Sequence, residues 1–390
     1  MISREELREL ANFECRQPDE FAISFYFEPG PPKDKSHREE AIFAKDVVRR
    51  TLQELQVNDG ARSAIADLER ILPLAESLHG NRARAKAVFA CSGRQVWKEF
   101  DLPANGAGTR LIVNRRFYLK PVAPIFSENP RLWVALFDRQ NARFLEVSLD
   151  EVKEQKHISN PVPRHGRSDG FGGYSAGHTE RHLQDEVRRH FQEAADFLKA
   201  AAENGLFEAL VIGCQDTTWP EIKDQLHPDV SKKILGRFSG EFTAVTNEEA
   251  AEQGRRVARE AIAKKREEML ATALDGSRSN GRGATGLRRV LRAAEQGEIE
   301  TIIMARDYAA RGIECTNCGH LDSHLVPYCA ACGRSTRQLD DICEALVPFA
   351  IRNNLEIVLL PPSDSLNQVG NIAAVLRFRA DQNVNELLAS

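Results

Sequence analysis

Hydrophobic and polar positions alternate along the first 130 residues in a way that predicts both strands and helices. Runs of apolar, β-branched and aromatic residues predict strands, and apolar positions at helical spacing predict helices between them. In chain order the predicted elements are a strand at Phe21–Phe27, helices at Ser36–Leu55 and Ala61–Leu78, a strand at Ala87–Cys91 and a strand-rich stretch at Arg110–Pro121. We therefore expect an N-terminal α/β domain over residues 1–130.

A second pattern begins at residue 131. Two β-type runs, Leu132–Phe137 and Arg143–Val147, are separated by a short polar stretch that predicts a hairpin. After a polar segment rich in Gly, His and Arg, a long amphipathic helix is expected. Its apolar positions recur at spacings of 4, 4, 3 and 4 residues, at Leu183, Val187, Phe191, Ala194 and Leu198. The pair Asn204-Gly205 is expected to end this helix.

The central pattern closes with a buried-type strand and another helix. Leu206–Gly213 predicts the strand, and its order after a strand and a helix indicates a mixed or parallel sheet. Thr246 and Glu249 form a capping-box pattern that opens a helix continuing to about Leu274. We expect a central domain over residues 131–276.

The last part of the chain begins with Gly276–Gly286, whose Gly, Ser, Asn and Arg content is typical of a flexible linker. Helices and strands then alternate, which predicts a small α/β/α layer domain over residues 277–390. The predicted elements are helices at Leu287–Gln296 and Thr336–Asn353 and strands at Ile299–Met304, Leu355–Leu360 and Ile372–Phe378. The whole chain is thus expected to be an α/β protein of three α/β domains.

Composition and charge narrow the class of protein. The 390 residues, 42% hydrophobic and 28% charged, are enough for two or three domains that each bury a core. The first residues lack the apolar region of a signal peptide, and no apolar run approaches the roughly 20 residues of a membrane helix. We therefore expect a cytoplasmic protein without membrane contact.

The formal net charge of −4 argues against a protein that coats nucleic acid through bulk positive charge. Any RNA contact must then come from local patches. One candidate patch, between Ser277 and Arg292, contains no acidic residue and has arginines at positions 278, 282, 288, 289 and 292. The same residues also suit a solvated linker followed by an exposed helix face, and both interpretations stay open.

The eight cysteines fall into two classes. Cys15, Cys91, Cys214 and Cys343 are scattered singly, which is typical of buried thiols in a reducing compartment. The other four form two Cys-x-x-Cys pairs separated by ten residues, at Cys315, Cys318, Cys329 and Cys332. Two such knuckles, each followed by a glycine, can place four thiolates around one Zn²⁺, in an insertion at about 313–335. Because four sulfur ligands leave no position for a reactive water, the zinc should be structural; a thiol redox site or unligated thiols are the alternatives.

The most unusual segment is rich in glycine, histidine and arginine and runs from Pro163 to His178, ahead of the long helix. Its five glycines leave the backbone free, so the segment is either ordered by a partner or a flexible surface loop. From Asn160 to His190 there are five arginines and four histidines against four acids. Backbone amides without Cβ cover, flanked by cations, suit phosphate or a crowded RNA cavity.

This segment resembles the class-1 release factors of archaea and eukaryotes and their paralogue Pelota. Their central domain carries His-Gly-Arg-Gly-Gly-Gln-Ser-Ala before a long helix with an Arg-His pair. In this chain the matching residues are His165, Gly166, Arg167, Gly172, Gly173, Tyr174, Ser175, Ala176, Arg189 and His190. The zinc insertion resembles that of archaeal members, and Val369–Phe378 is similar to their Gly-Gly-Ile-Ala-Ala-Ile-Leu-Arg-Tyr ending. The resemblance covers about residues 131–390 and implies central and C-terminal domains like the middle and C-terminal domains of those factors.

Two departures limit which activity the resemblance implies. The first 130 residues lack the Asn-Ile-Lys-Ser codon-reading motif, so stop-codon recognition is not expected. Tyr174 occupies the position of the family's catalytic glutamine. Its bulky ring cannot order a water molecule as a small amide does, although its backbone amide can still donate to an oxyanion.

The resemblance implies a divergent, bacterial-type factor that fills the ribosomal A site in rescue or hibernation, as Pelota and the related hibernation factor Balon do. The loop would enter the peptidyl-transferase centre, near ribosomal RNA and the P-site tRNA, and the third domain would face a translational GTPase. The residues expected to contact RNA are Arg164, His165, Arg167, Tyr174, His178 and Arg181. In the alternative, Gly172, Gly173 and Tyr174 form the catalytic tip of a peptidyl-tRNA hydrolase.

Overall fold

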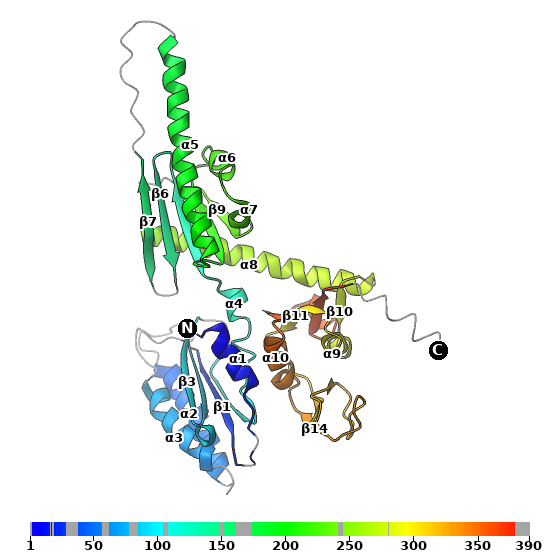
Figure 1. Ribbon diagram of the computed structural model, residues 1–390. Coiled ribbons are helices and arrows are strands. Elements are labelled where there is room, and N and C mark those ends of the chain that lie inside the picture. Colours follow the sequence, from blue (N-terminus) through cyan, green and yellow to red (C-terminus); the bar gives the residue numbers. More distant parts are fainter. Residues whose placement is uncertain are drawn as a thin grey trace. The chain divides into compact units, whose positions relative to one another are not determined.

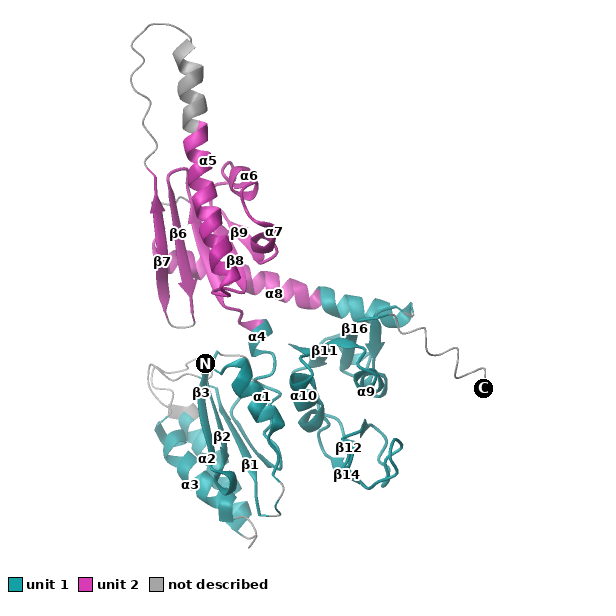
Figure 2. Cartoon of the chain, in the orientation of Figure 1, with its two compact units in different colours: residues 1–127, 268–390 teal, residues 128–267 magenta. Residues whose placement is uncertain are grey.

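The computed structural model describes the chain except for short stretches, and its contacts divide it into two compact units (Figure 2). Unit 1 comprises residues 1–127 and 268–390, and unit 2 comprises residues 128–267. The described residues are 2–15, 17, 19–28, 38–56, 62–77, 85–103, 108–148, 151–160, 174–240, 245–279 and 281–378. Side chains are described from residue 41 in the first of the two long N-terminal helices and from residue 184 in the helix that begins at 174. The three-domain division at residues 130 and 276 stays a prediction.

The first part of unit 1 is a four-stranded antiparallel sheet of order β3-β2-β1-β4. Its elements are α1 (Arg4–Asn12), β1 (Ala22–Phe27), α2 (Arg38–Gln56), α3 (Arg62–Ser77), β2 (Ala85–Cys91), β3 (Val96–Leu102) and β4 (Arg110–Asn114). Apolar residues of α2 and α3 pack on one face of this sheet, and α1 belongs to the core on the other face. The predicted strands and both long helices are confirmed, whereas α1 and β3 had no prediction. The strand expected to reach Pro121 ends at Asn114, because residues 115–121 form bends, irregular backbone and a turn.

The second part of unit 1 is built on a sheet of order β10-β16-β11-β15, in which β11 and β15 are parallel and the other pairs antiparallel. A separate three-stranded sheet, β13-β12-β14, carries the cysteine pairs. The elements are β10 (Gly283–Thr285), α9 (Leu287–Glu295), β11 (Ile299–Ala305), β12 (Gly312–Cys315), β13 (Leu321–Asp322), β14 (Thr336–Leu339), α10 (Cys343–Arg352), β15 (Glu356–Leu360), α11 (Asp364–Asn367) and β16 (Ile372–Leu376).

Two sequence predictions for this part are wrong. The helix expected at Thr336–Asn353 begins only at Cys343, because Thr336–Leu339 pairs with β12 as strand β14 and tertiary pairing overrides local propensity. The expected flexible linker is compact. Gly276 lies in the last turn of α8, and Gly283 pairs in β10, where a Cβ would lie 2.1 Å from the Ala273 carbonyl oxygen.

Unit 2 is a mixed five-stranded sheet of order β7-β6-β5-β8-β9, parallel from β5 to β9 and antiparallel from β5 to β7. Its elements are β5 (Leu132–Phe137), β6 (Asn141–Val147), β7 (Val152–Ser159), α5 (Tyr174–Glu203), β8 (Ala209–Gly213), α6 (Trp219–Lys223), α7 (Pro228–Ser231), β9 (Ile234–Phe238) and α8 (Asn247–Arg278), whose residues from 268 onward belong to unit 1. The short helix α4 (Ile125–Glu128) precedes β5, and only its last residue belongs to unit 2. The hairpin, the long helix and the mixed sheet are confirmed. Strand β7 was missed because its sequence is largely polar, and the short strand β9 was missed as well. Figure 1 shows α5 lying along the sheet.

Helices cover both faces of this sheet. The buried α5 residues Val187, Phe191 and Leu198 pack with Trp133 and Phe144. The first turns of α8 cover the other face, close enough that a Cβ on Gly254 would lie 2.3 Å from the Val134 side chain. Both units therefore have the α/β fold that the sequence predicts.

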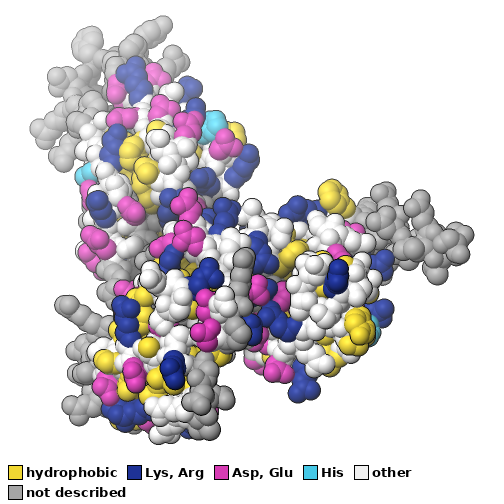
Figure 3. Space-filling view, turned by 60° about the horizontal axis from the view of Figure 1, so that its bottom comes forward, with side chains coloured by type: hydrophobic (Ala, Val, Ile, Leu, Met, Phe, Trp, Pro, Cys, Tyr) yellow, Lys and Arg dark blue, Asp and Glu magenta, His cyan; other side chains and the backbone are white. Residues whose placement is uncertain are grey.

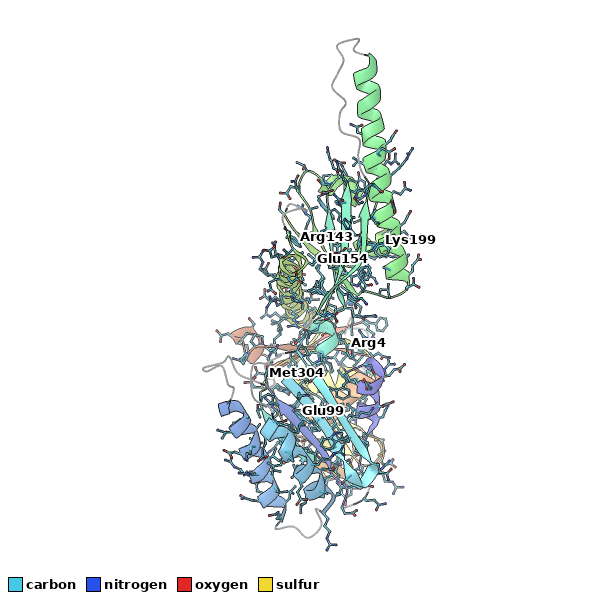
Figure 4. The ribbon with its side chains drawn as sticks, turned by 90° about the vertical axis from the view of Figure 1, so that its left-hand side faces the viewer. Arg4, Glu99, Arg143, Glu154, Lys199 and Met304 are labelled. Atoms are coloured by element: carbon cyan, nitrogen blue, oxygen red, sulfur yellow. The ribbon has the colours of Figure 1, made fainter. Side chains whose placement is uncertain are left out.

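Polar side chains hold the start of α8 on the sheet. Arg143 donates to Asn247 Oδ1 over 3.0 Å and to the Val245 carbonyl over 2.6 Å. Asn247 Nδ2 in turn donates to Glu154 Oε2 over 2.9 Å. Figure 4 shows Arg143 and Glu154 near each other, on neighbouring strands β6 and β7.

The surface carries both signs of charge. Figure 3 shows Lys and Arg side chains intermixed with Asp and Glu over one face, in keeping with the small net charge. Within the described residues, no helix is both long and apolar enough to cross a membrane.

Candidate functional site: a four-cysteine centre and the base of the glycine loop

The four clustered cysteines converge at the ends of short strands. Their Sγ atoms all lie within 4.8 Å of one another. Cys315 Sγ lies 3.4 Å from Cys332 Sγ, and Cys318 Sγ lies 3.7 Å from Cys329 Sγ. Four sulfurs at about 2.3 Å from a tetrahedral Zn²⁺ would be roughly 3.8 Å apart, so the donor set fits zinc.

Both Cys-x-x-Cys pairs form the same turn. Gly319 and Gly333 follow the pairs at φ of 74° and 73°, a left-handed conformation that favours glycine. Their backbone amides donate to the carbonyls of Cys315 and Cys329, over 3.1 and 2.9 Å. The knuckles are thus shaped by their own backbone, as the sequence predicts.

Backbone amides also point at the sulfurs. The amides of Asn317 and Cys318 lie 3.4 and 3.5 Å from Cys315 Sγ, and the amide of Ala331 lies 3.3 Å from Cys329 Sγ. The amides of Cys318, foremost, and Asn317 lower the pKa of Cys315 to about 6. Because metal ligation requires the thiolate, these two amides favour ligation by Cys315.

The two histidines of the insertion bind carboxylates. His320 Nδ1 lies 2.9 Å from Glu295 Oε1 of α9, and His324 Nδ1 lies 3.0 Å from Asp322 Oδ1. His324 is exposed and His320 half-buried. Among the described residues, the cluster of candidate metal ligands contains neither histidine.

The predicted glycine-loop site lies largely outside the described residues. Arg164, His165, Arg167, Gly172 and Gly173 fall in the undescribed stretch 161–173. Tyr174, His178 and Arg181 lie on α5, which begins at Tyr174, but their side chains are also outside the described part. Their roles in RNA binding or catalysis stay predictions.

What the structure does describe is the base of this loop. Asn160, the last described residue before it, donates its backbone amide to the Gln140 carbonyl over 2.8 Å. Its side-chain Nδ2 donates to Glu193 Oε2 over 3.0 Å and lies 3.3 Å from His190 Nδ1. The chain is therefore fixed to the middle of α5 at the residue before the loop begins. The sequence marked His190 by family resemblance only, and Asn160 as an anchor was missed.

Helix α5 sets the distance from this base to the end of the loop. Its first buried side chain among residues 184–203 is Val187. Tyr174 lies thirteen residues earlier in the same helix, so it stands roughly 20 Å from Val187 along the axis at 1.5 Å per residue. The loop thus begins after Asn160, which is bound to the middle of α5, and ends at Tyr174, the first residue of the same helix.

Burial lowers the pKa of His190 below its ordinary value of 6.5. Since the unfolded chain then binds a proton more readily than the folded one, the stability present above pH 6.5 should be lost as pH falls through the folded pKa. We expect the free energy of unfolding to drop as the pH falls below about 6.5, and His190→Gln to remove part of that drop. Urea unfolding at several pH values measures it.

The exposed His157 supplies the control for this prediction, because its side chain is 44% exposed. A His157→Gln variant should keep the full pH dependence of the wild type. Equal pH profiles for His190→Gln and the wild type would contradict the assignment.

The structure also describes the four scattered cysteines and three arginines of the arginine patch. The four scattered cysteines are all buried, as predicted for core thiols. In the arginine patch, Arg278, Arg282 and Arg289 pair with Asp275, Glu300 and Glu298. Much of its charge is thus neutralised, and RNA contact there stays an untested prediction.

Comparisons with known proteins bear on the same regions. Residues 118–266 match the family model of the bacterial archaeo-eukaryotic release factor family 10. Peptide chain release factor subunit 1 of Archaeoglobus fulgidus is 22% identical over 287 residues, which cover 68% of this chain and 70% of that protein.

Similar solved structures include an archaeal translation termination factor, aRF1, at 15% identity with a TM-score of 0.26, covering 97% of this chain and 99% of the other. Archaeal Pelota, from a model of ribosome-bound Pelota and ABCE1, is 14% identical with a TM-score of 0.42, covering 97% and 94%. Pelota of Archaeoglobus fulgidus is 15% identical with a TM-score of 0.32, covering 77% and 81%. The sequence matches confirm the predicted resemblance to the archaeo-eukaryotic release factors, in which residues 118–266 match bacterial family 10.

Proposed function

We propose that this chain is a release-factor- and Pelota-like translation factor that binds the ribosome. It occupies the A site of stalled or idle ribosomes, in rescue or hibernation, and places the loop containing Gly172, Gly173 and Tyr174 in the peptidyl-transferase centre. The observation that carries the proposal is the family match over residues 118–266, which includes both the glycine-rich loop and helix α5.

The fixed base of the loop supports this role. Asn160 and His190 hold the start of the loop on the sheet-packed part of α5, while Tyr174 opens the helix roughly 24 Å from His190 along the axis. A long helix with a glycine-rich loop at its N-terminal end suits insertion of that loop into a confined cavity. Cations in the loop would contact phosphates, and its backbone amides would approach RNA closely.

Binding should depend on the loop arginines and fall steeply with salt. Co-sedimentation with ribosomes over a salt series measures this. We expect the double variant Arg164→Gln/Arg167→Gln to lose about tenfold or more in affinity and to show a shallower salt slope.

A matched variant removes two positive charges from elsewhere in unit 2. Arg139 and Arg259 are exposed and pair with Glu221 and Glu252. Arg139→Gln/Arg259→Gln should bind like the wild type. Equal weakening by both double variants would show that net charge, and not the loop, governs binding.

A second candidate function is hydrolysis of peptidyl-tRNA on stalled ribosomes. It is favoured by the match to a peptide chain release factor subunit and by the Gly172-Gly173 pair. The Tyr174 backbone amide would donate to the developing oxyanion. In this mechanism the tyrosine ring would not order the attacking water as glutamine does.

Release of labelled peptide from stalled ribosomes separates the two candidates. Turnover that Gly173→Ala abolishes, and that Gly240→Ala leaves intact, would establish the hydrolase. Gly240 suits this control because, among the described residues, the atom nearest to a Cβ there is 3.6 Å away. Tight binding without turnover would establish the binding factor.

A further inference from the structure

A short segment after β4 joins the two parts of unit 1. We call residues 115–120 the strap, residues 1–127 the N-terminal lobe and residues 268–390 the C-terminal lobe. Phe117 and Leu119 are both 1% exposed and belong to an apolar core to which both lobes contribute. Phe117 stacks on Phe13 with ring centroids 4.6 Å apart and meets Phe89 edge-on.

The alternate residues of the strap bind the C-terminal lobe. Tyr118 Oη donates to Asp341 Oδ2 over 3.3 Å, and buried Lys120 donates to the Tyr308 carbonyl. Arg116 Nη1 donates to both carboxylate oxygens of Glu314, over 2.7 and 2.8 Å. The strap thus binds the C-terminal lobe through Arg116, Tyr118 and Lys120, while Phe117 packs against aromatic rings of the N-terminal lobe.

Arg116 belongs to a closed ring of alternating charges. Its Nη2 lies 2.9 Å from Glu14 Oε1, in the N-terminal lobe. Arg337 completes the ring, with Nη2 2.7 Å from Glu314 Oε2 and 3.5 Å from Glu14 Oε1. The Glu314 side chain is 9% exposed and that of Arg116 16%. A charge left unpaired at such burial is costly, so the ring is stabilising only while all four members keep their places.

The C-terminal half of this ring is built on the cysteine centre. Glu314 and Arg337 are directly opposite each other in the β12–β14 pair. The next residue pair is Cys315 with Thr336, and Cys315 is one of the four clustered thiols. A metal bound by both knuckles would therefore hold together the ends of the two strands that carry Glu314 and Arg337.

We propose that zinc bound at Cys315, Cys318, Cys329 and Cys332 also fastens the N-terminal lobe to the C-terminal lobe through the Glu14–Arg116–Glu314–Arg337 ring. Loss of the metal frees the ends of β12 and β14, misaligns Glu314 with Arg337 and loosens the strap. The zinc site thus stabilises the contact between the two lobes as well as the fold of its own insertion. This inference does not depend on ribosome binding.

Hydrogen–deuterium exchange of the full chain, with zinc bound and after removal by a chelator, tests the proposal. We expect exchange of the strap and of α1 to rise about tenfold or more on zinc loss. Strands β11 and β16 of the main C-terminal sheet should exchange as before. Unchanged exchange in the strap would overturn the proposal, and so would an equal rise in β11 and β16, which would mean that zinc supports the whole lobe.

Two variants of the zinc-bound protein complete the test. Glu314→Gln breaks the ring without touching a thiol, so strap exchange should rise, or zinc should be held more weakly, because coupling is reciprocal. Glu300→Gln is the matched control, since Glu300 pairs with Arg282 on the exposed surface of the same lobe. An unchanged Glu314→Gln variant, or the same effect in both variants, would overturn the proposal. If Glu314→Gln does not fold, the chelation experiment on the wild type decides alone.

Discussion

Replacing Gly283 with alanine is expected to destabilise unit 1 by about 3 kcal/mol or more. A Cβ at this position would lie 2.1 Å from the Ala273 carbonyl oxygen and 2.4 Å from the Ser277 amide nitrogen. Both are backbone atoms near the C-terminal end of α8, so no side-chain rotation relieves the clash. Either α8 or strand β10 must move, and β10 pairs with β16. Denaturant unfolding of the purified variant measures the loss.

Gly240→Ala is the control for this prediction, because a Cβ there meets only ordinary van der Waals contact at 3.6 Å. That variant should unfold within about 0.5 kcal/mol of the wild type. A Gly283→Ala variant as stable as the Gly240→Ala variant would contradict the close approach of α8 to β10.

Removing one cysteine of the cluster is expected to have the second large effect. Cys315→Ser replaces a thiolate whose strand also carries Glu314, and hydroxyl oxygen is a poor zinc ligand. We expect zinc content after gel filtration to fall from about one ion per chain to well under half, with a loss of several kcal/mol because binding energy is folding energy in such sites. Metal analysis and thermal unfolding measure the two effects.

The buried Cys214 offers a matched control, because it lies in unit 2 and outside the cysteine cluster. Cys214→Ala should retain the zinc content of the wild type. A Cys315→Ser protein that still holds a full complement of zinc would contradict the four-cysteine centre. Zinc loss in both variants would indicate a site elsewhere.

Much of the fold could be predicted because the strongest patterns are local. The period of α5 and the apolar runs at β1, β5 and β11 reflect burial that each element carries in its own sequence. The missed strand β7 has one buried residue among eight, so its sequence has little apolar signal, and only its pairing with β6 makes it a strand.

The errors in the C-terminal lobe have a common cause. The glycines of the expected linker are needed for close approach of α8 to β10, and composition alone does not distinguish this from flexibility. Likewise, Thr336–Leu339 is a strand because of β12, a partner over twenty residues away in the chain.

The candidate sites likewise differ in whether their residues lie close together in the sequence. Cysteine spacing predicts the metal centre, because the knuckle geometry is local. The Glu14–Arg116–Glu314–Arg337 ring could not be predicted, since its members are scattered charged residues that only the tertiary fold brings together.

A reconstruction of the chain bound to stalled ribosomes, at a resolution that shows side chains, tests the central claim most directly. The account predicts residues 161–173 in the peptidyl-transferase centre, with Tyr174 at the head of α5 and the loop arginines against ribosomal RNA. A chain bound with this loop pointing away from the peptidyl-transferase centre, or one that does not bind ribosomes, would contradict it.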